Sequence, residues 1–210
     1  MNKPILIQYP KDKSIIYSKH PRILMQLQDD MSRENAIIYV TLKNQDGVFN
    51  YTSIMNPKNF SAIAFNNNSK LAFTCDDFSY GKNRLSIAVY HDNDFSENEI
   101  LDIIYEEPLL NINNDYFPIS TDVYEKLLIM TNSTLDAYSR DKLDIKLPIK
   151  NITSINRQYF REINNALYDL NSWINKTYPG LARIKIKQII NMKKISLDIY
   201  NSLIDLIINL

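Results

Sequence analysis

Residues 35–43 read NAIIYVTLK and residues 84–91 read RLSIAVYH, and in both runs apolar and polar side chains alternate. Successive side chains of a β-strand point to opposite faces, so each run predicts a strand with one buried face. Similar short runs rich in Ile, Val, Tyr, Phe and Thr fill the chain from residue 4 onward, at 4–9, 14–18, 22–28, 48–54, 60–65 and 70–75. Seven or eight strands about 8 to 12 residues apart are typical of an antiparallel sandwich or barrel.

The segments between these runs carry turn-forming residues. "NNNS", at 66–69, separates the apolar runs that end at Phe65 and begin at Lys70. Asparagine adopts positive φ at little cost, which favours a tight connection between two antiparallel strands. The sequence therefore predicts a β-hairpin around residues 66–69.

An acid-rich stretch follows from residue 92 to 115. Within it, "ENEILDIIYEE" at 97–107 predicts one short helix, because Glu97 and Glu99 would stand in its first turn. A second helix is predicted at 120–140, with Ser120 or Thr121 as N-cap and apolar residues every three or four positions. Residues 141–150 alternate and reach Pro148, which is consistent with a linker or an edge strand.

The strongest helical pattern lies between residues 155 and 174. Its apolar side chains recur at steps of three and four and form a broad stripe on one face of a helix of about 20 residues. Thr153 or Ser154 is suited to cap the start, and Pro179 and Gly180 end it. The stripe consists of Ile155, Tyr159, Phe160, Ile163, Ala166, Leu167, Leu170, Trp173 and Ile174.

Basic and isoleucine residues alternate after this helix, in "RIKIK" at 183–187. The alternation predicts a half-buried basic strand at 182–190, followed by a final helix from about residue 191 or 196. A single helix from Ala182 to Asn209 is the alternative. The expected fold is α+β, with an antiparallel β-sandwich or barrel at 1–118 and a mainly helical region at 119–210.

Few residues suit catalysis or metal binding. The chain has 2 His, 1 Cys and 3 Gly, which excludes a histidine-rich zinc site and a glycine-rich phosphate loop. "HDND" at 91–94 lacks the Gly and Glu that a calcium loop requires at its sixth and twelfth positions. Cys75 lies in a strand-like run and is expected to be a buried structural thiol. No catalytic, cofactor-binding or metal-binding residue is therefore predicted.

One weak nuclease-like order of residues is present in the chain. Asp136 or Asp141, followed by Asp144 and Lys146, has the order of acids and lysine used by metal-dependent nucleases. The neighbouring residues lack the apolar strand core that such a site needs, so a charged linker is the preferred interpretation.

Charge is distributed unevenly although the formal net charge is +0. Residues 1–150 hold 16 basic and 20 acidic residues, a net of -4, and residues 151–210 hold 8 and 4, a net of +4. Opposite blocks of this kind are able to pair within or between subunits. The predicted interface joins a basic and an acidic group on adjacent copies, formed by Arg183, Lys185, Lys187, Lys193 and Lys194 and by Glu97, Glu99, Glu106 and Glu107.

These observations favour a non-catalytic structural protein that forms homo-oligomers and contacts other assembly proteins. Its 25 Asn and 31 Ile indicate an A/T-rich genome, which suits a bacteriophage or other viral particle, as a neck, tail or capsid-associated component. Nucleic-acid binding by the basic strip is an alternative, disfavoured because no aromatic residues interleave with it. A host-interaction module is a second alternative function. We expect no signal peptide and no membrane span, and hence a virion or host-cytoplasm location.

Overall fold

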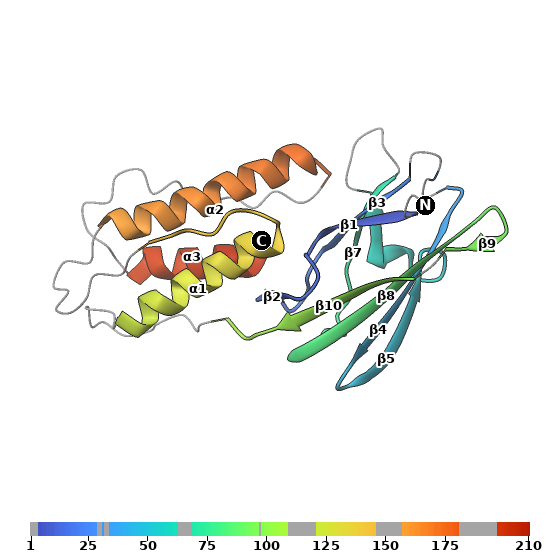
Figure 1. Cartoon of the computed structure of the whole chain (residues 1–210), viewed down its shortest axis with the longest axis horizontal. Helices are drawn as coiled ribbons and strands as arrows, with labels where there is room; N and C mark the ends of the chain where they lie inside the picture. The colour runs from blue at the N-terminus through green and yellow to red at the C-terminus, as the bar shows by residue number, and fades with distance from the viewer. Residues whose placement is uncertain are drawn as a thin grey trace.

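The computed structural model describes residues 4–28, 31, 34–62, 69–96, 98–108, 121–145, 157–180 and 197–210. Within these ranges two β-sheets occupy the N-terminal part and three helices the C-terminal part. Figure 1 shows the helices gathered at one end of the molecule and the sheets at the other. The α+β class and the sandwich-like arrangement predicted from the sequence are confirmed.

The smaller sheet has four strands in the order β1-β3-β7-β6. All of its pairs are antiparallel. β3 is buried along most of its length because Ile23, Leu24 and Met25 are all apolar and covered. The strands are β1 (Ile5–Tyr9), β3 (Ile23–Leu27), β7 (Lys70–Phe73) and β6 (Phe60–Ala62), and the 3-10 turn η1 (Pro57–Asn59) precedes β6.

The larger sheet has six strands, in the order β2-β10-β8-β4-β5, with β9 paired to β8. β2 runs parallel to β10, and the other pairs are antiparallel, so the sheet is mixed. The strands are β2 (Ser14–Ile16), β10 (Glu99–Tyr105), β8 (Gly81–His91), β4 (Ile37–Asn44), β5 (Gly47–Thr52) and β9 (Asp94–Phe95).

The alternation in the two opening runs determines which face of the larger sheet is buried. In β4 the even-numbered residues from Ile38 to Leu42 are buried, and in β8 the odd-numbered residues from Asn83 to Val89 are buried. Burial of one such aliphatic side chain stabilises the fold by about 2 kcal/mol. The buried faces form one core with the smaller sheet and leave the opposite face of the larger sheet uncovered by described residues.

The predicted hairpin at 66–69 is supported by the pairing of its two flanking strands. β6 and β7 are antiparallel, with Phe60 opposite Phe73 and Ala62 opposite Leu71. Residues 66–68 of the turn itself lie outside the described residues.

The predicted helix at 97–107 is wrong, because residues 99–105 form strand β10. Leu101 and Ile103 are buried on the inner face, while Ile100 and Ile104 lie on the outer face opposite Ser86 and Lys82 of β8. Apolar residues on both faces hid the period of two in the sequence. Two factors favour the strand. Isoleucine is β-branched and prefers extended backbone, and the backbone N–H and C=O groups of β8 find hydrogen-bond partners in β10.

The helical predictions are confirmed at their main positions. The helices are α1 (Thr121–Ala137), α2 (Arg157–Thr177) and α3 (Leu197–Asn209). Most of the predicted apolar stripe of α2 is buried, and Trp173 is half-buried under Arg140, whose guanidinium carbon lies 4.2 Å from the ring centroid. The predicted capping residues Ser120, Thr153 and Ser154 and the predicted basic strand at 182–190 lie outside the described residues.

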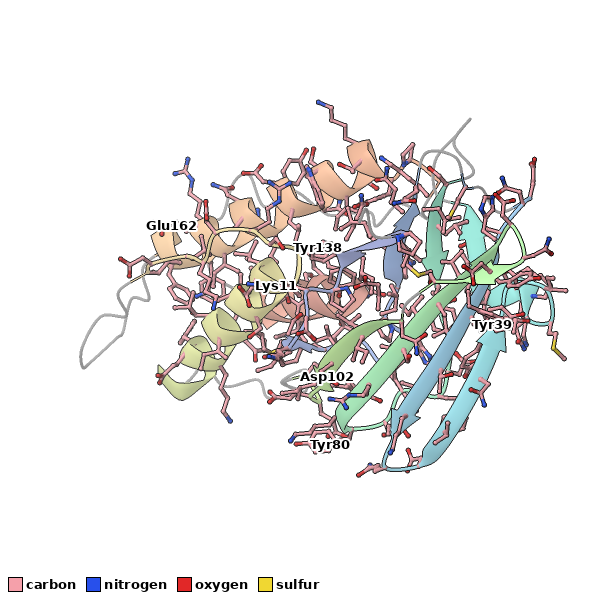
Figure 2. The ribbon with its side chains drawn as sticks, turned by 45° about the vertical axis from the view of Figure 1, so that its right-hand side comes forward. Lys11, Tyr39, Tyr80, Asp102, Tyr138 and Glu162 are labelled. Atoms are coloured by element: carbon pink, nitrogen blue, oxygen red, sulfur yellow. The ribbon has the colours of Figure 1, made fainter. Side chains whose placement is uncertain are left out.

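The helices join the sheets through β1 and the turn that follows it. The ring of Tyr9 stacks on that of Tyr138 with centroids 3.8 Å apart. The backbone N–H of Lys11 donates to the carbonyl of Ala137 at 2.9 Å, and Tyr178 donates its hydroxyl hydrogen to Gln8 at 2.6 Å. Figure 2 shows Lys11 and Tyr138 close together where the strands meet the helices.

None of the helices in the described ranges is both long and apolar enough to span a membrane.

Candidate functional site

The residues predicted to form the interface are only partly described. The five basic residues from Arg183 to Lys194 and the acidic Glu97 lie outside the described residues. Glu99 begins β10, and Glu106 and Glu107 follow its last residue. Glu99 therefore lies at one end of β10, and Glu106 and Glu107 lie beyond the other end, about 20 Å away. The structure does not gather them into a single patch, and their pairing with the basic residues stays a prediction.

The uncovered face of the larger sheet carries several of the large hydrophobic side chains that are exposed among the described residues. It carries the odd-numbered residues of β4 and the even-numbered residues of β5, β8 and β10. Val48 of β5 is 58% exposed and Ile100 of β10 is 56% exposed. Large aliphatic side chains on an uncovered sheet are typical of a surface that another molecule covers. We call this surface the open face.

Three aromatic rings meet at one end of the open face, which we call the aromatic patch. Phe95 of β9 lies between Tyr39 and Tyr90, with ring centroids 5.2 Å and 4.9 Å away. Phe95 is 57% exposed. The rings are inclined to each other by 59° and 52°, so they do not form the flat platform on which a sugar ring or a base stacks. Inclined, exposed rings instead suit the apolar side chains of a protein partner.

The aromatic patch is held in place by the tight turn between β8 and β9. Asp92 and Asn93 form its two-residue loop with φ of 51° and 66°, while His91 pairs with Asp94. Positive φ at both central residues gives the turn that matches the twist of the two strands, and Asp and Asn tolerate it well. The hydroxyl of Tyr90 lies 3.2 Å from Oδ1 of Asn93 and donates a hydrogen bond to it. The turn therefore fixes both Phe95 and Tyr90.

A hollow of about 500 Å³ adjoins this turn. Ile37 and Ile54 contribute apolar surface to it, and Tyr90, His91 and Asp92 line the other side. Nδ1 of His91 lies 3.4 Å from a carboxylate oxygen of Asp92. The lining also holds Ser53, whose hydroxyl oxygen accepts a hydrogen bond from the backbone N–H of Ile38 at 3.1 Å, while His91 faces Asp92. The geometry does not join His91 and Ser53 into a base and nucleophile pair.

A charged pair crosses the far end of the open face. Arg84 donates two hydrogen bonds to the carboxylate of Asp102, at 2.6 Å and 2.8 Å. This hydrogen bonding holds the pKa of Asp102 below its ordinary value and raises that of Arg84. Both side chains are too solvated for the pair to stabilise the fold strongly.

The nuclease-like order is not assembled in the described residues. Asp136 lies beside two cations, with Lys11 Nζ at 3.4 Å and Lys142 Nζ at 3.9 Å. Asp144 lies in the coil after α1, and Lys146 is outside the described residues. In the part of the chain that the structure describes, no group of three or more His, Cys, Asp and Glu side chains is placed to hold a metal ion.

Cys75 is buried, as predicted. Burial raises the pKa of its thiol to about 11, so the reactive thiolate is scarce at neutral pH. Asn83 of β8 is also buried. Its side chain accepts a hydrogen bond from Ser79 N–H at 3.1 Å and donates to the carbonyls of Ser79 and Gly81 at 2.8 Å and 3.0 Å. These groups are structural.

Comparisons with known proteins identify no family. No family model and no curated protein matches the chain. Among solved structures, it is similar to part of the chitinase ChiW from Paenibacillus sp. str. FPU-7, a cell-surface-expressed multi-modular enzyme, at 12% identity and a TM-score of 0.34. That match covers 81% of this chain and 16% of the chitinase chain. A likeness at this level carries no argument about function.

Sequence reasoning did not find the open face or the aromatic patch. Their signal was present in the odd-numbered Tyr39 and Thr41 of β4, which alternate with buried residues. What the sequence could not give is the strand order, because it depends on contacts between segments far apart in the chain. Only the order places Phe95 beside Tyr39.

Proposed function

We propose that this protein is a non-catalytic structural component that acts through protein–protein contacts. We further propose that it forms homo-oligomers and that its assembly is a viral or bacteriophage particle, in which it serves as a neck, tail or capsid-associated protein. This role places it in the virion or in the host cytoplasm.

The open face is the observation that supports the proposal. Val48, Phe95 and Ile100 each expose more than half of their surface on one side of a single sheet. The cost of leaving these side chains in water falls when another protein covers them, by about 25 cal/mol for each Å² removed from water. The inclined rings of the aromatic patch suit such a partner.

The sequence supports the viral part of the proposal through composition. The abundance of Asn and Ile indicates an A/T-rich genome, as many bacteriophages and large DNA viruses have. The opposed net charges of residues 1–150 and 151–210 favour electrostatic complementarity between copies, which selects partners and sets their orientation more than it adds affinity.

Solution mass tests the proposal directly. Light scattering over micromolar to sub-millimolar protein is expected to give a mass above the 24.6 kDa of one chain. The double variant Lys185→Glu/Lys187→Glu should shift the mass toward the monomer, because it places acids where the predicted interface needs bases. Lys19→Glu/Lys126→Glu changes the net charge equally at two exposed positions outside the predicted interface and is the matched control.

The outcomes separate the proposal from its rivals. A monomer at every concentration contradicts self-assembly. Equal effects of the two double variants would mean that net charge, rather than the predicted basic residues, controls association. Retention of DNA or RNA at low salt, lost as salt rises and abolished by the Lys185 and Lys187 reversals, would support the nucleic-acid alternative instead.

A further inference from the structure

Strand β5 forms an edge of the larger sheet. Among the described residues it pairs with β4 alone, from Gly47 opposite Asn44 to Thr52 opposite Tyr39. Figure 1 shows β5 as the outermost strand of its sheet. The other edge of the sheet differs, because β2 is only three residues long and α1 packs against it.

Three hydrogen bonds determine which backbone groups of β5 point to the open side. Ser53 N–H donates to the carbonyl of Ile38 at 3.0 Å, so odd-numbered residues in this segment bond to β4. Thr52 points the other way, because its N–H and carbonyl bond to Asn56 at 3.1 Å and 2.9 Å. By the same alternation, the N–H and carbonyl groups of Val48 and Asn50 face the open side.

β5 lacks the features that usually protect an edge strand. Edges are commonly blocked by a lysine, a proline, a bulge or a very short length. β5 reads GVFNYT, pairs with β4 without a register shift and contains no charged residue and no proline. The side chain of Asn50 is held on the open face by Thr41, whose hydroxyl donates to it at 2.8 Å, so it does not cover the edge.

We infer that β5 pairs with β5 of a second copy, antiparallel and about a two-fold axis at Phe49. In this register Val48 of each copy lies opposite Asn50 of the other, and the two residues exchange backbone hydrogen bonds, about four in all. The larger sheets of the two copies then form one continuous sheet. This inference deepens the proposed function, because it rests on self-assembly and names one contact that performs it.

A second copy fits this edge because the open segment is self-complementary in length. Asn56 covers the edge at Thr52, so the open part covers residues 47–51. With the axis at Phe49, Gly47 of the partner lies opposite Tyr51, and the partner's chain turns away at Asp46, opposite the covered Thr52. The partner strand therefore ends at the position where Asn56 covers the edge of β5.

Charge also suits a second copy. β5 itself is uncharged, so its pairing brings no like charges together. Exposed Asp46 precedes the strand, and exposed Lys58 follows the capping residue Asn56. An antiparallel pair brings the start of each strand toward the end of the other, and thus Asp46 toward the segment that bears Lys58. Like charges at both ends would instead have opposed the pairing.

The contact should be weak and concentration-dependent. Stable interfaces bury about 1,200 to 2,000 Å² in total, and one short strand pair buries less. We therefore expect a reversible dimer contact that depends on further contacts in a larger assembly.

Amide hydrogen exchange with residue resolution tests the edge itself. In dilute protein the amides of Phe49 and Tyr51 should exchange slowly, because they bond to β4, and those of Val48 and Asn50 should exchange fast. At sub-millimolar concentration, exchange at Val48 and Asn50 should slow about tenfold or more. No contact on the open face alone would protect these two amides.

Two lysine substitutions provide a matched comparison. Val48→Lys places a charge on the edge strand and should raise the dissociation constant about tenfold or more. Ile100→Lys places the same charge at an equally exposed position of the open face, two strands from β4, and should change it less than threefold. Both positions are exposed, so both variants should fold, and circular dichroism checks this.

Each result decides the inference. Oligomers that form while Val48 and Asn50 still exchange fast overturn the β5 contact but leave self-assembly standing. Equal weakening by Val48→Lys and Ile100→Lys overturns it in favour of the open face. A monomer at every concentration overturns both this inference and the proposed function.

Discussion

Asn83 shows how one polar residue determines the local backbone between Ser79 and Gly81. It is 1% exposed, and its amide binds Ser79 twice and Gly81 once through backbone groups. It also accepts a hydrogen bond from the side chain of Asn44 at 3.1 Å. Buried polar groups stabilise a fold only when they are satisfied, and here one side chain satisfies several.

Substitution of Asn83 tests this role. Asn83→Ala should lower the free energy of unfolding by about 2 to 4 kcal/mol, because it leaves buried partners of the amide without hydrogen bonds. Asn50→Ala is the control, since the side chain of Asn50 is exposed and its hydrogen bond among the described residues is to Thr41, and should cost about 0.5 kcal/mol or less. Urea denaturation measures both. Equal losses would show that the buried network contributes no more than an exposed hydrogen bond.

At the scale of elements, the sequence predicted what depends on local patterns. The alternation in β4 and β8 and the stripe of α2 each report on a single segment that faces one core, so periodicity is sufficient. Residues 99–105 were predicted wrongly because both faces of β10 carry isoleucine. The β5 edge and the aromatic patch were not predicted, because they depend on which strands become neighbours. The parallel pairing of β2 with β10, across about 90 residues of chain, is beyond local reasoning for the same reason.

The stack of Tyr9 on Tyr138 is the element contact through which β1 holds α1. Tyr9→Ala should lower the free energy of unfolding by about 3 to 5 kcal/mol, because it removes a buried ring and leaves a cavity between the sheet and the helices. Tyr39→Ala, which removes a ring from the exposed aromatic patch, should cost about 1 kcal/mol.

The fluorescence of Trp173 measures this contact well, because this single tryptophan lies beside Tyr138, with ring centroids 6.3 Å apart. In the unsubstituted protein its transition in urea should coincide with that of the circular dichroism signal, as expected when sheets and helices unfold together. If Tyr9→Ala changes only the fluorescence transition, the helices unfold separately from the sandwich.

At the scale of the whole molecule, some surfaces of the sheets form the core and others remain available for contacts with other molecules. The smaller sheet and one face of the larger sheet form the core, and the helices are joined at β1 and β2. This arrangement leaves the open face and the β5 edge on the side of the sheet that the described helices do not cover (Figure 1). Because both surfaces belong to one sheet, a partner bound at the edge can extend across the face.

Buried tyrosines give the whole molecule a characteristic response to alkaline pH. Burial raises the pKa of Tyr9 and Tyr138 above the ordinary value of 10.0 and that of Tyr124 to about 12. Above pH 10 the unfolded chain loses these protons while the folded chain keeps them, so the unfolded state binds fewer protons. Stability is therefore complete below pH 10 and falls as pH rises further, by as much as about 1.4 kcal/mol per pH unit for each buried tyrosine.

Urea denaturation at a series of pH values from neutral to strongly alkaline measures this fall. Tyr9→Phe removes one titrating group while it keeps the ring, so the slope above pH 10 should become shallower by about 1 kcal/mol per pH unit. Tyr80→Phe, at a side chain that is 59% exposed, should leave the slope unchanged. A slope that Tyr9→Phe does not alter would mean that Tyr9 ionises equally in both states, and that its burial against Tyr138 does not persist in solution.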